Sequence, residues 1–283
     1  MKIVGMVPAR LQSSRLPEKA LIDIMGLPMV IHTCKRAQLA KKLDDVYLVT
    51  DSDLIKRAGE KYDVKVIMTG THHKTGSDRL AEACQKIDCD IVVNIQGDEP
   101  LVNPEHIDAI VGPLVEDPSV PISVGVTPYT KKNSISDIKA VLDLQGNILY
   151  CSRTDLPSDA RTPVIEMLKM CFIVPFRKDF LLLYTSWEPT PLETLEFNEY
   201  LRVLEHGFKM RAVRIEGAKI SVDTPEDLEE VRKFMEEDSI RSVSYTHLRA
   251  HETPEHLVCR LLLEKKKIIY ISITSFYTYL ILK

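Results

Sequence analysis

Four strand-like segments, each followed by a segment with helical spacing, constrain the fold of this chain more than any other feature. They are Ile3–Val7, Val46–Thr50, Lys65–Thr69 and Ile91–Ile95. A run such as Ile91–Ile95 is too apolar to leave one face in water, so we expect layers on both faces of its sheet. The alternation predicts an α/β fold with a mostly parallel sheet between two layers of helices.

The second half of the chain departs from this alternation. Gln145-Gly146-Asn147 suits a hairpin turn, and one long helix is predicted from Thr190 to His206. Further strands are predicted at Ile122–Val126, Lys139–Asp143, Ile148–Arg153, Met210–Ile215 and Ile220–Val222. The sheet is therefore expected to be mixed.

Net charge and cysteine content exclude several broad classes. The formal net charge is −4, so nothing general points to nucleic acid or a membrane surface, and a phosphate site needs a local group of cations. The six cysteines show no C-x-x-C spacing, which indicates neither a zinc site nor a disulfide framework. The chain passes directly into a strand without a signal peptide, so we expect a cytoplasmic protein with reduced thiols.

A cationic loop follows the first predicted strand. Pro8 has no N–H to donate and is expected to end the strand ladder. The loop then carries two hydroxyl side chains and three cations, namely Ser13, Ser14, Arg10, Arg15 and Lys19. The carboxyl end of a strand is where open α/β sheets bind ligands, and Arg and Lys suit phosphate oxygens. A solvated basic loop is the alternative.

The order of residues in this loop, PAR-x-x-SSRLP-x-K from Pro8 to Lys19, resembles the signature loop of the 3-deoxy-manno-octulosonate cytidylyltransferases, the CMP-Kdo synthetase family. These sugar nucleotidyltransferases activate acidic keto-sugars with CTP. The chain has no Walker motif, G-x-x-x-x-G-K. The resemblance implies that five loop residues bind the nucleotide: Pro8, Ala9, Arg10, Arg15 and Lys19. Arg10 and Lys19 are also implied as catalytic.

The resemblance covers about residues 1–236 and implies a three-layer nucleotide-diphospho-sugar transferase fold with a mostly parallel mixed sheet. Residues 1–240 would form the cytidylyltransferase domain. About 145–205 would form a small sugar-binding and dimerisation subregion, so a homodimer is expected.

Two aspartates are candidates for a metal site. Asp98 lies in Gln96-Gly97-Asp98-Glu99-Pro100, directly after a buried strand, where Mg²⁺ would find carboxylate ligands. An ordinary turn is the alternative. Thr224 and Asp227 suit a helix cap, which leaves Asp223 unexplained. The resemblance makes Asp98 and Asp223 a pair of catalytic aspartates that binds Mg²⁺.

Further site residues come from the resemblance. The run T-G-S-D-R, which ends in Arg79, matches a family motif, although Ser77 or Asp78 could simply cap a helix. Ser77, Arg79 and Gln96 are implied at the nucleotide site, and Gln96 also at the sugar. Arg153 and Glu199 are the other implied sugar-binding residues, with Lys139 a weaker candidate for the sugar carboxylate.

Three positions depart from the family pattern around the sugar. Met170 and Val174 stand where the family has His and Tyr, and Tyr200 stands where Gln is usual. The sugar could therefore be Kdo, an amino analogue such as 8-amino-Kdo, a nonulosonate or another 2-keto-3-deoxy sugar acid.

The predicted reaction is Mg²⁺-dependent transfer of CMP from CTP to the anomeric hydroxyl of the sugar acid, with release of pyrophosphate, for lipopolysaccharide or surface polysaccharide synthesis. Two alternatives stay open. One is a uridylyl- or guanylyltransferase of the same fold. The other is a non-catalytic nucleotide-binding protein.

Residues 241–283 are expected to be a non-native or disordered tail. VSYTHLRAHET, from Val243, and HLVCRLLLEKKK, from His256, resemble the translation, in one frame, of a sequencing adapter. The apolar run Ile268–Leu282 is short for a membrane anchor, which needs about 20 residues.

Overall fold

The computed structural model describes residues 1–12, 16–163, 166–218, 220–238 and 240. The chain divides into two compact units, Met1–Asp238 and Ser239–Lys283. Everything below concerns the first unit, because the expected tail at 241–283 lies outside the described residues. No helix in the described ranges is both long enough and apolar enough to cross a bilayer.

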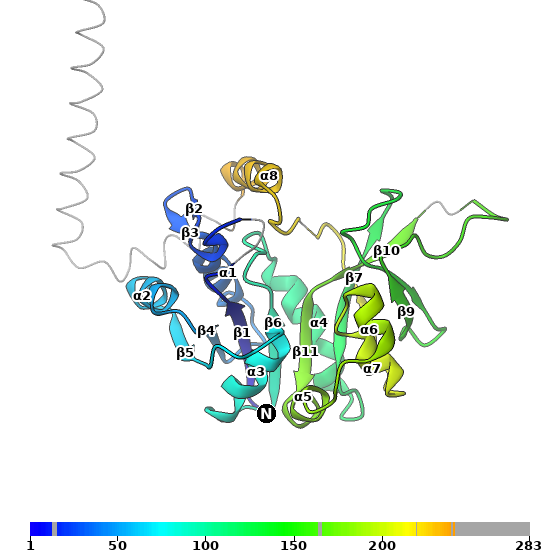
Figure 1. Cartoon of the computed structure of the whole chain (residues 1–283), viewed down its shortest axis with the longest axis horizontal. Helices are drawn as coiled ribbons and strands as arrows, with labels where there is room; N and C mark the ends of the chain where they lie inside the picture. The colour runs from blue at the N-terminus through cyan, green and yellow to red at the C-terminus, as the bar shows by residue number, and fades with distance from the viewer. Residues whose placement is uncertain (13–15, 164–165, 219, 239, 241–283) are drawn as a thin grey trace, which may run out of the picture. The chain divides into compact units, whose positions relative to one another are not determined.

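The first sheet confirms the predicted parallel core. Its strand order is β11-β6-β1-β4-β5, and every pair in it is parallel except β11 with β6 (Figure 1). The strands are β1 (Ile3–Ala9), β4 (Asp45–Thr50), β5 (Lys65–Met68), β6 (Ile91–Ile95) and β11 (Ile173–Arg177).

Alternation along β1 and β6 divides the core between two helical layers. Val4, Met6 and Val92 pack in one cluster with side chains of α3 (Gly76–Gln85) and α5 (Lys178–Thr185). The intervening residues pack in a second cluster with α1 (Met29–Ala37), α2 (Asp53–Lys61) and α4 (Pro104–Glu116). Because successive strand residues point to opposite faces, both faces of the sheet are buried, which gives three layers.

A second sheet, of mixed direction, adjoins the first. Its order is β12-β7-β10-β8-β9, with β7 and β12 parallel and the other pairs antiparallel. An isolated bridge between Ile122 and Phe176 joins the residue before β7 to β11, an edge strand of the first sheet. The predicted hairpin is confirmed. The strands are β7 (Ser123–Tyr129), β8 (Lys139–Leu142), β9 (Ile148–Ser152), β10 (Met167–Cys171) and β12 (Arg211–Arg214).

The helix predicted from Thr190 to His206 is wrong, because it is two helices, α6 (Pro191–Glu196) and α7 (Leu201–Glu205). Phe197 ends α6 with φ of 50°. Across the break, Arg202 Nε donates to Glu193 at 2.7 Å in a buried ion pair. A continuous helix would separate these residues by about 13 Å along its axis. The break also brings Glu199 to face α3.

Two strand predictions need correction near the site. Pro8 does not end β1, which continues through Ala9. Beyond Met6, β1 pairs only with β4, and proline is tolerated where one side of a strand is unpaired. Ile220 and Val222 form no strand, although the Val222 N–H donates to the Asp98 carbonyl at 2.9 Å. The remaining elements are a 3₁₀ turn (Lys19–Leu21), β2 (Asp23–Ile24), β3 (Leu27–Pro28) and α8 (Pro225–Glu236).

Candidate active site

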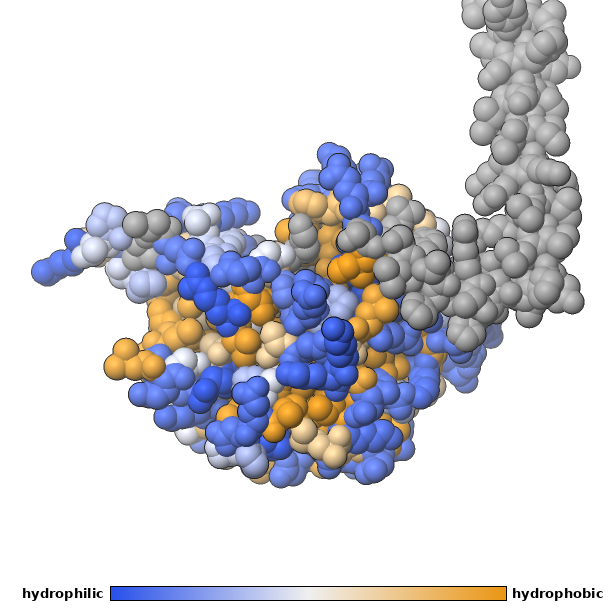
Figure 2. Space-filling model, turned by 180° about the vertical axis from the view of Figure 1, so that it is seen from behind, coloured by the Kyte–Doolittle hydropathy of each residue, from blue (hydrophilic) through white to orange (hydrophobic). Residues whose placement is uncertain are grey.

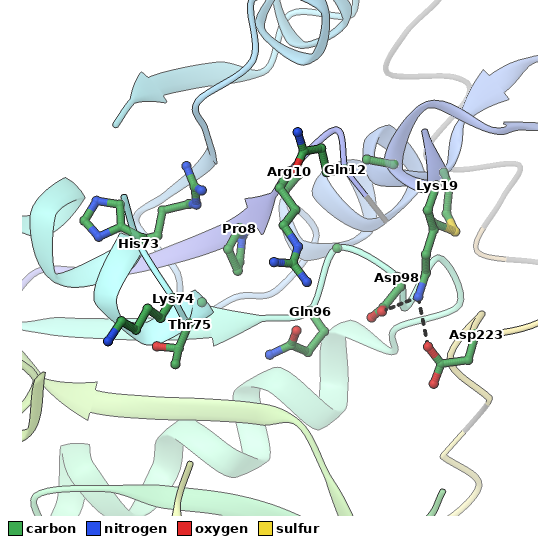
Figure 3. A pocket seen from close by; sticks show the side chains of 16 residues that line it. Pro8, Arg10, Gln12, Lys19, His73, Lys74, Thr75, Gln96, Asp98 and Asp223 are labelled. Carbon is green, nitrogen blue, oxygen red and sulfur yellow. Dashed lines mark hydrogen bonds and ion pairs between the residues drawn. The ribbon is translucent and has the colours of Figure 1, made fainter. Parts of the chain in front are cut away.

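A cavity of about 340 Å³ opens at the carboxyl ends of β1 and β6. Its lining joins residues from the cationic loop, the start of α3, the turn after β6 and the segment before α8 (Figure 3). Eight of the predicted site residues line it: Pro8, Ala9, Arg10, Lys19, Arg79, Gln96, Asp98 and Asp223. Arg15 lies outside the described residues.

Lys19 connects the two predicted metal aspartates. Its Nζ lies 2.7 Å from Asp98 Oδ2 and 3.1 Å from Asp223 Oδ1 (Figure 3). The Lys19 side chain is 13% exposed, and the two carboxylates are 31% and 43% exposed. The carboxylates therefore converge on one positive charge and still face the cavity.

Backbone contacts explain how two aspartates so far apart in sequence meet. The Val222 N–H bond to the Asp98 carbonyl sets Asp223 beside Asp98. The Asp223 N–H then donates to Asp227 Oδ2 at 2.9 Å, within the capping box of α8, which confirms the predicted cap. On the other side, a Cβ at Gly97 would lie 2.9 Å from the Pro8 carbonyl oxygen. Glycine there lets the turn after β6 approach β1 closely.

Arg79 lines the cavity and is also paired within the protein. Its guanidinium donates to Asp51 Oδ2 at 2.8 Å and to Thr69 Oγ1 at 2.7 Å. This arrangement fixes the segment that follows β5 against the start of α3. Arg79 therefore supports the wall of the cavity, whereas Arg10 is exposed at its rim.

The N-cap of α3 is predicted at Ser77 or Asp78, two or three residues after the true N-cap. Thr75 is the N-cap, in a capping box with Asp78, so Ser77 lies inside the first turn. Ser77 is fully buried and its hydroxyl donates to Glu199 Oε1 at 3.1 Å. The Tyr184 hydroxyl also contacts this residue, at 3.3 Å from Oε2, and burial raises the pKa of Glu199. Neither Ser77 nor Glu199 lines the cavity.

Arg153 also lies away from the cavity lining. Its guanidinium donates to four backbone carbonyls, which belong to Ile135, Ser136, Glu196 and Phe197. The weaker candidate, Lys139, is fully buried and donates to the carbonyls of Ser134 and Asp137, the latter at 2.8 Å. Both cations hold the second sheet to its loops.

The profile of the cytidylyltransferase family matches residues 4–240. A 3-deoxy-manno-octulosonate cytidylyltransferase of Geobacter metallireducens is 40% identical over 248 residues, with 82% of this chain and 96% of that protein covered. A mitochondrial 3-deoxy-manno-octulosonate cytidylyltransferase of Arabidopsis thaliana is 37% identical over 243 residues, with 83% and 84% covered. This chain belongs to the 3-deoxy-manno-octulosonate cytidylyltransferase family. It is therefore a nucleotidyltransferase.

A solved structure agrees with this family. CMP:2-keto-3-deoxy-manno-octonic acid synthetase complexed with CTP superimposes with a TM-score of 0.81 at 33% identity, covering 84% of this chain and 99% of that one. The fold predicted from the motifs is thereby confirmed.

The three positions that depart from the family pattern are all in the core of this cytidylyltransferase. Met170 and Val174 pack in the same buried cluster as Tyr200. The Tyr200 hydroxyl accepts from Asn94 Nδ2 at 3.2 Å, and its ring stacks with that of Phe172 at 6.0 Å. Met170 and Val174 thus make apolar contacts, and Tyr200 packs its ring in the same cluster.

Glu99, next to Asp98, has an unusual environment. Burial, together with the negative charge of Asp98, raises the pKa of Glu99 to about 8. This environment thus favours the protonated form of the Glu99 carboxyl group. A cation at the neighbouring aspartates would favour its ionised form.

Sequence reasoning missed several residues that line the cavity, above all Gln12, His73, Lys74 and Thr75. Gln12 lies inside the cationic loop, and the other three immediately precede the T-G-S-D-R match or begin it. Their side-chain types carry no strong signal alone. Because β1, β4 and β5 are parallel neighbours, the segments that follow β1 and β5 reach the same edge of the first sheet.

Proposed function

We propose that this cytidylyltransferase transfers CMP from CTP to the anomeric hydroxyl of 3-deoxy-manno-octulosonate, or of a related 2-keto-3-deoxy sugar acid, and releases pyrophosphate. The product would serve lipopolysaccharide or surface polysaccharide synthesis. The observation that carries the proposal is the convergence of Lys19, Asp98 and Asp223 at the carboxyl edge of the first sheet. The names of the relatives and the CTP complex of the solved relative support the choice of substrates.

The cationic loop would bind the triphosphate. Arg10, Arg15 and Lys19 would contact the phosphates and the leaving pyrophosphate, with Pro8 and Ala9 providing backbone contacts. Charge develops on phosphate oxygens during nucleotidyl transfer, so fixed cations stabilise the transition state more than the bound substrate. Gln96 would lie where nucleotide and sugar meet, and Arg79 would orient the wall through Asp51 and Thr69.

The two aspartates fit Mg²⁺, which is our proposed cofactor. Two carboxylates with oxygens that converge on one cationic centre, in an open and polar cavity, are the donor set that this hard cation prefers. When bound, Mg²⁺ would neutralise phosphate charge and favour the attacking alkoxide. Asp98 and Asp223 would hold it, and Lys19 would then be released from at least one carboxylate to contact phosphate.

The sugar would bind on the side of Gln96 that faces the second sheet. Glu199 and Arg153 stay our proposed sugar contacts by family position, and Ser77 would orient Glu199 through its hydrogen bond. Met170, Val174 and Tyr200 stand where the family pattern has other residues, so 8-amino-Kdo and nonulosonates belong in the test beside Kdo.

We also propose a homodimer built on the second sheet. Figure 2 shows apolar side chains at the surface on the side of the molecule that carries this sheet. Four large apolar side chains in this half of the molecule are strongly exposed: Ile135 at 80%, Leu149 at 61%, Leu195 at 76% and Phe197 at 83%. Covering exposed apolar side chains favours association. A cytoplasmic location is supported by five free, buried cysteines among the described residues.

A pyrophosphate-release screen tests the proposal. Each of CTP, UTP, GTP and ATP is paired with Kdo, 8-amino-Kdo and a nonulosonate, with Mg²⁺ present and absent. We expect CTP with one of these sugar acids to give the fastest turnover. Faster turnover with UTP or GTP would favour the alternative transferases, and no turnover with any pair would favour a non-catalytic binding protein.

A further inference from the structure

A second group of ligand-type side chains lies beside the active-site cavity. His72, His73 and Glu82 each present one ring nitrogen or carboxylate oxygen, and these atoms all lie within 4.8 Å of one another. Across the described ranges, no other three His, Cys, Asp or Glu side chains have this spacing. The histidines belong to the segment between β5 and α3, and Glu82 lies on α3.

Glu82 is held ready as a charged ligand. It accepts from the Gly70 N–H at 2.9 Å and from Lys86 Nζ at 2.7 Å, and His73 Nε2 lies 2.5 Å away. The hydrogen bonds from Lys86 and Gly70 lower the pKa of Glu82 to about 2. The His73 side chain is only 8% exposed, so its ring position is fixed.

Gly70 makes room for the second imidazole. A Cβ at this residue would lie 2.5 Å from His72 Nδ1 and 3.4 Å from Glu82 Oε2. Glycine therefore lets the His72 ring fold back over the segment, toward the carboxylate. The ring centroids of His72 and His73 are 4.3 Å apart.

We propose that His72, His73 and Glu82 form a second metal site that binds a borderline divalent cation such as Zn²⁺. Two imidazoles and one carboxylate are a common three-ligand set for zinc, whereas Mg²⁺ prefers oxygen alone. The group opens on a cavity of about 600 Å³, which leaves space for water at the fourth position. At about 2 Å per ligand, the three atoms need only small movements to close on one ion.

The bound cation would tie the segment after β5 to α3. Lys74 and Thr75 follow directly, and they line the active-site cavity together with His73. The site is nevertheless distinct from the aspartate pair, which lies at the opposite end of that cavity (Figure 3). Saturating Mg²⁺ should therefore leave it available.

Titration of the untagged full chain with Zn²⁺, and separately with Co²⁺, tests this site. Mg²⁺ is kept in excess, and a chromophoric chelator competes for the metal. The titrated background carries His247→Gln, His251→Gln and His256→Gln, which removes the histidines beyond the described residues. We expect one equivalent to bind, with Co²⁺ giving the visible bands of a four-coordinate site.

Matched variants decide the outcome. His72→Gln changes an exposed side chain and should fold, and it should weaken zinc binding by at least about tenfold. Gly70→Ala, which displaces the His72 ring, and Glu82→Gln should weaken it as well. His106→Gln, on α4, should not. Undiminished affinity in the His72→Gln and Glu82→Gln variants, or no binding in the background chain, would overturn the proposal.

Discussion

The two sides of the active region use their polar groups in opposite ways. At the sheet edge where we propose that CTP binds, called the nucleotide edge below, Lys19, Asp98 and Asp223 converge and remain partly exposed to the cavity. On the side where we propose that the sugar acid binds, called the sugar side below, the predicted contacts are already paired with the protein itself: Glu199 with Ser77 and Tyr184, and Arg153 with four carbonyls. The first edge is pre-organised for a charged ligand. The second would have to exchange internal hydrogen bonds for contacts with a sugar acid.

This difference predicts where substitutions have their largest effects. Charged groups that face a cavity act directly on the transition state, so their loss lowers kcat. Groups that must first break internal contacts affect binding more than turnover, because the exchange has a small net free energy.

The largest expected effect is at the aspartate pair. Asp98→Asn or Asp223→Asn should each lower turnover by about a hundredfold or more, because each would remove a charged ligand of the proposed metal and keep the side-chain shape. The measurement is steady-state pyrophosphate release at saturating Mg²⁺, with circular dichroism to confirm the fold. Asp159→Asn, on an exposed loop, is the matched control. Near wild-type turnover in either variant would show that this residue is not a metal ligand.

Lys19 should come next. Lys19→Ala should lower kcat/KM for CTP by about tenfold to a hundredfold, because it removes a cation that we propose to contact the phosphates. Arg10→Ala should act in the same direction and more weakly, since Arg10 is exposed. Lys41→Ala, an exposed lysine at the end of another turn, controls for loss of positive charge. Unchanged kinetics would indicate a solvated basic loop that does not act on the phosphates.

Glu199 tests the other side of the comparison. Glu199→Gln should raise KM for the sugar acid by up to about tenfold and leave KM for CTP unchanged, because the change removes an acceptor on the sugar side alone. Ser77→Ala should produce a smaller change of the same kind, through loss of one hydrogen bond to Glu199. A matching rise in KM for CTP in both variants would show that the two sides are not separate.

The nucleotide edge was largely predictable from sequence because its parts are local. One buried strand is followed by cations, and another is followed by Gly97 and Asp98. These local patterns predict a ligand-binding edge of the sheet without knowledge of any tertiary contact. Family resemblance was still needed for Asp223, because its position depends on a hydrogen bond from Val222 to a residue more than a hundred positions away.

The sugar side was predicted less well, for a physical reason. The ion pair between Glu193 and Arg202 breaks a segment whose local pattern reads as one helix. Serine is a common helix-capping residue, yet Thr75 caps α3 and Ser77 is buried. In both cases tertiary contacts override local helix propensity, and such contacts cannot be predicted from the spacing of residues in the sequence.

Glu99 follows Asp98 at the nucleotide edge, and its ionisation gives a smaller, pH-dependent effect. Its pKa is about 8 in the folded chain and 4.5 ordinarily, so between these values the folded state holds a proton that the unfolded state has lost. Stability conferred by that proton is present at low pH and falls as pH rises through this window. Without divalent cations, Glu99→Gln should flatten the decline, because glutamine has no proton to lose in this range. Urea unfolding at a series of pH values measures it, and parallel curves would contradict the assignment.

The smallest expected effect on activity comes from the end of the first unit and depends on one residue. Asp238 forms an ion pair with Arg36, whose buried guanidinium also donates to the carbonyls of Val102 at 2.7 Å and Leu101 at 3.2 Å. These carbonyls lie a few residues beyond Asp98, so the pair supports the nucleotide edge. A chain that ends at Asp238 should keep activity, solubility and thermal midpoint, or improve them.

A chain that ends at Glu237 should lose about 1 to 3 kcal/mol of stability, because the buried Arg36 guanidinium loses its carboxylate partner while its two carbonyl acceptors remain. Any kinetic consequence should appear in KM for CTP and leave KM for the sugar acid unchanged, as the comparison of the two sides requires. Thermal unfolding and steady-state kinetics of the two truncated chains beside the full chain measure this. Asp238→Asn in the full chain isolates the ion pair from the length of the chain. A clear loss of activity or stability in the chain that ends at Asp238 would show that residues beyond it support the enzyme.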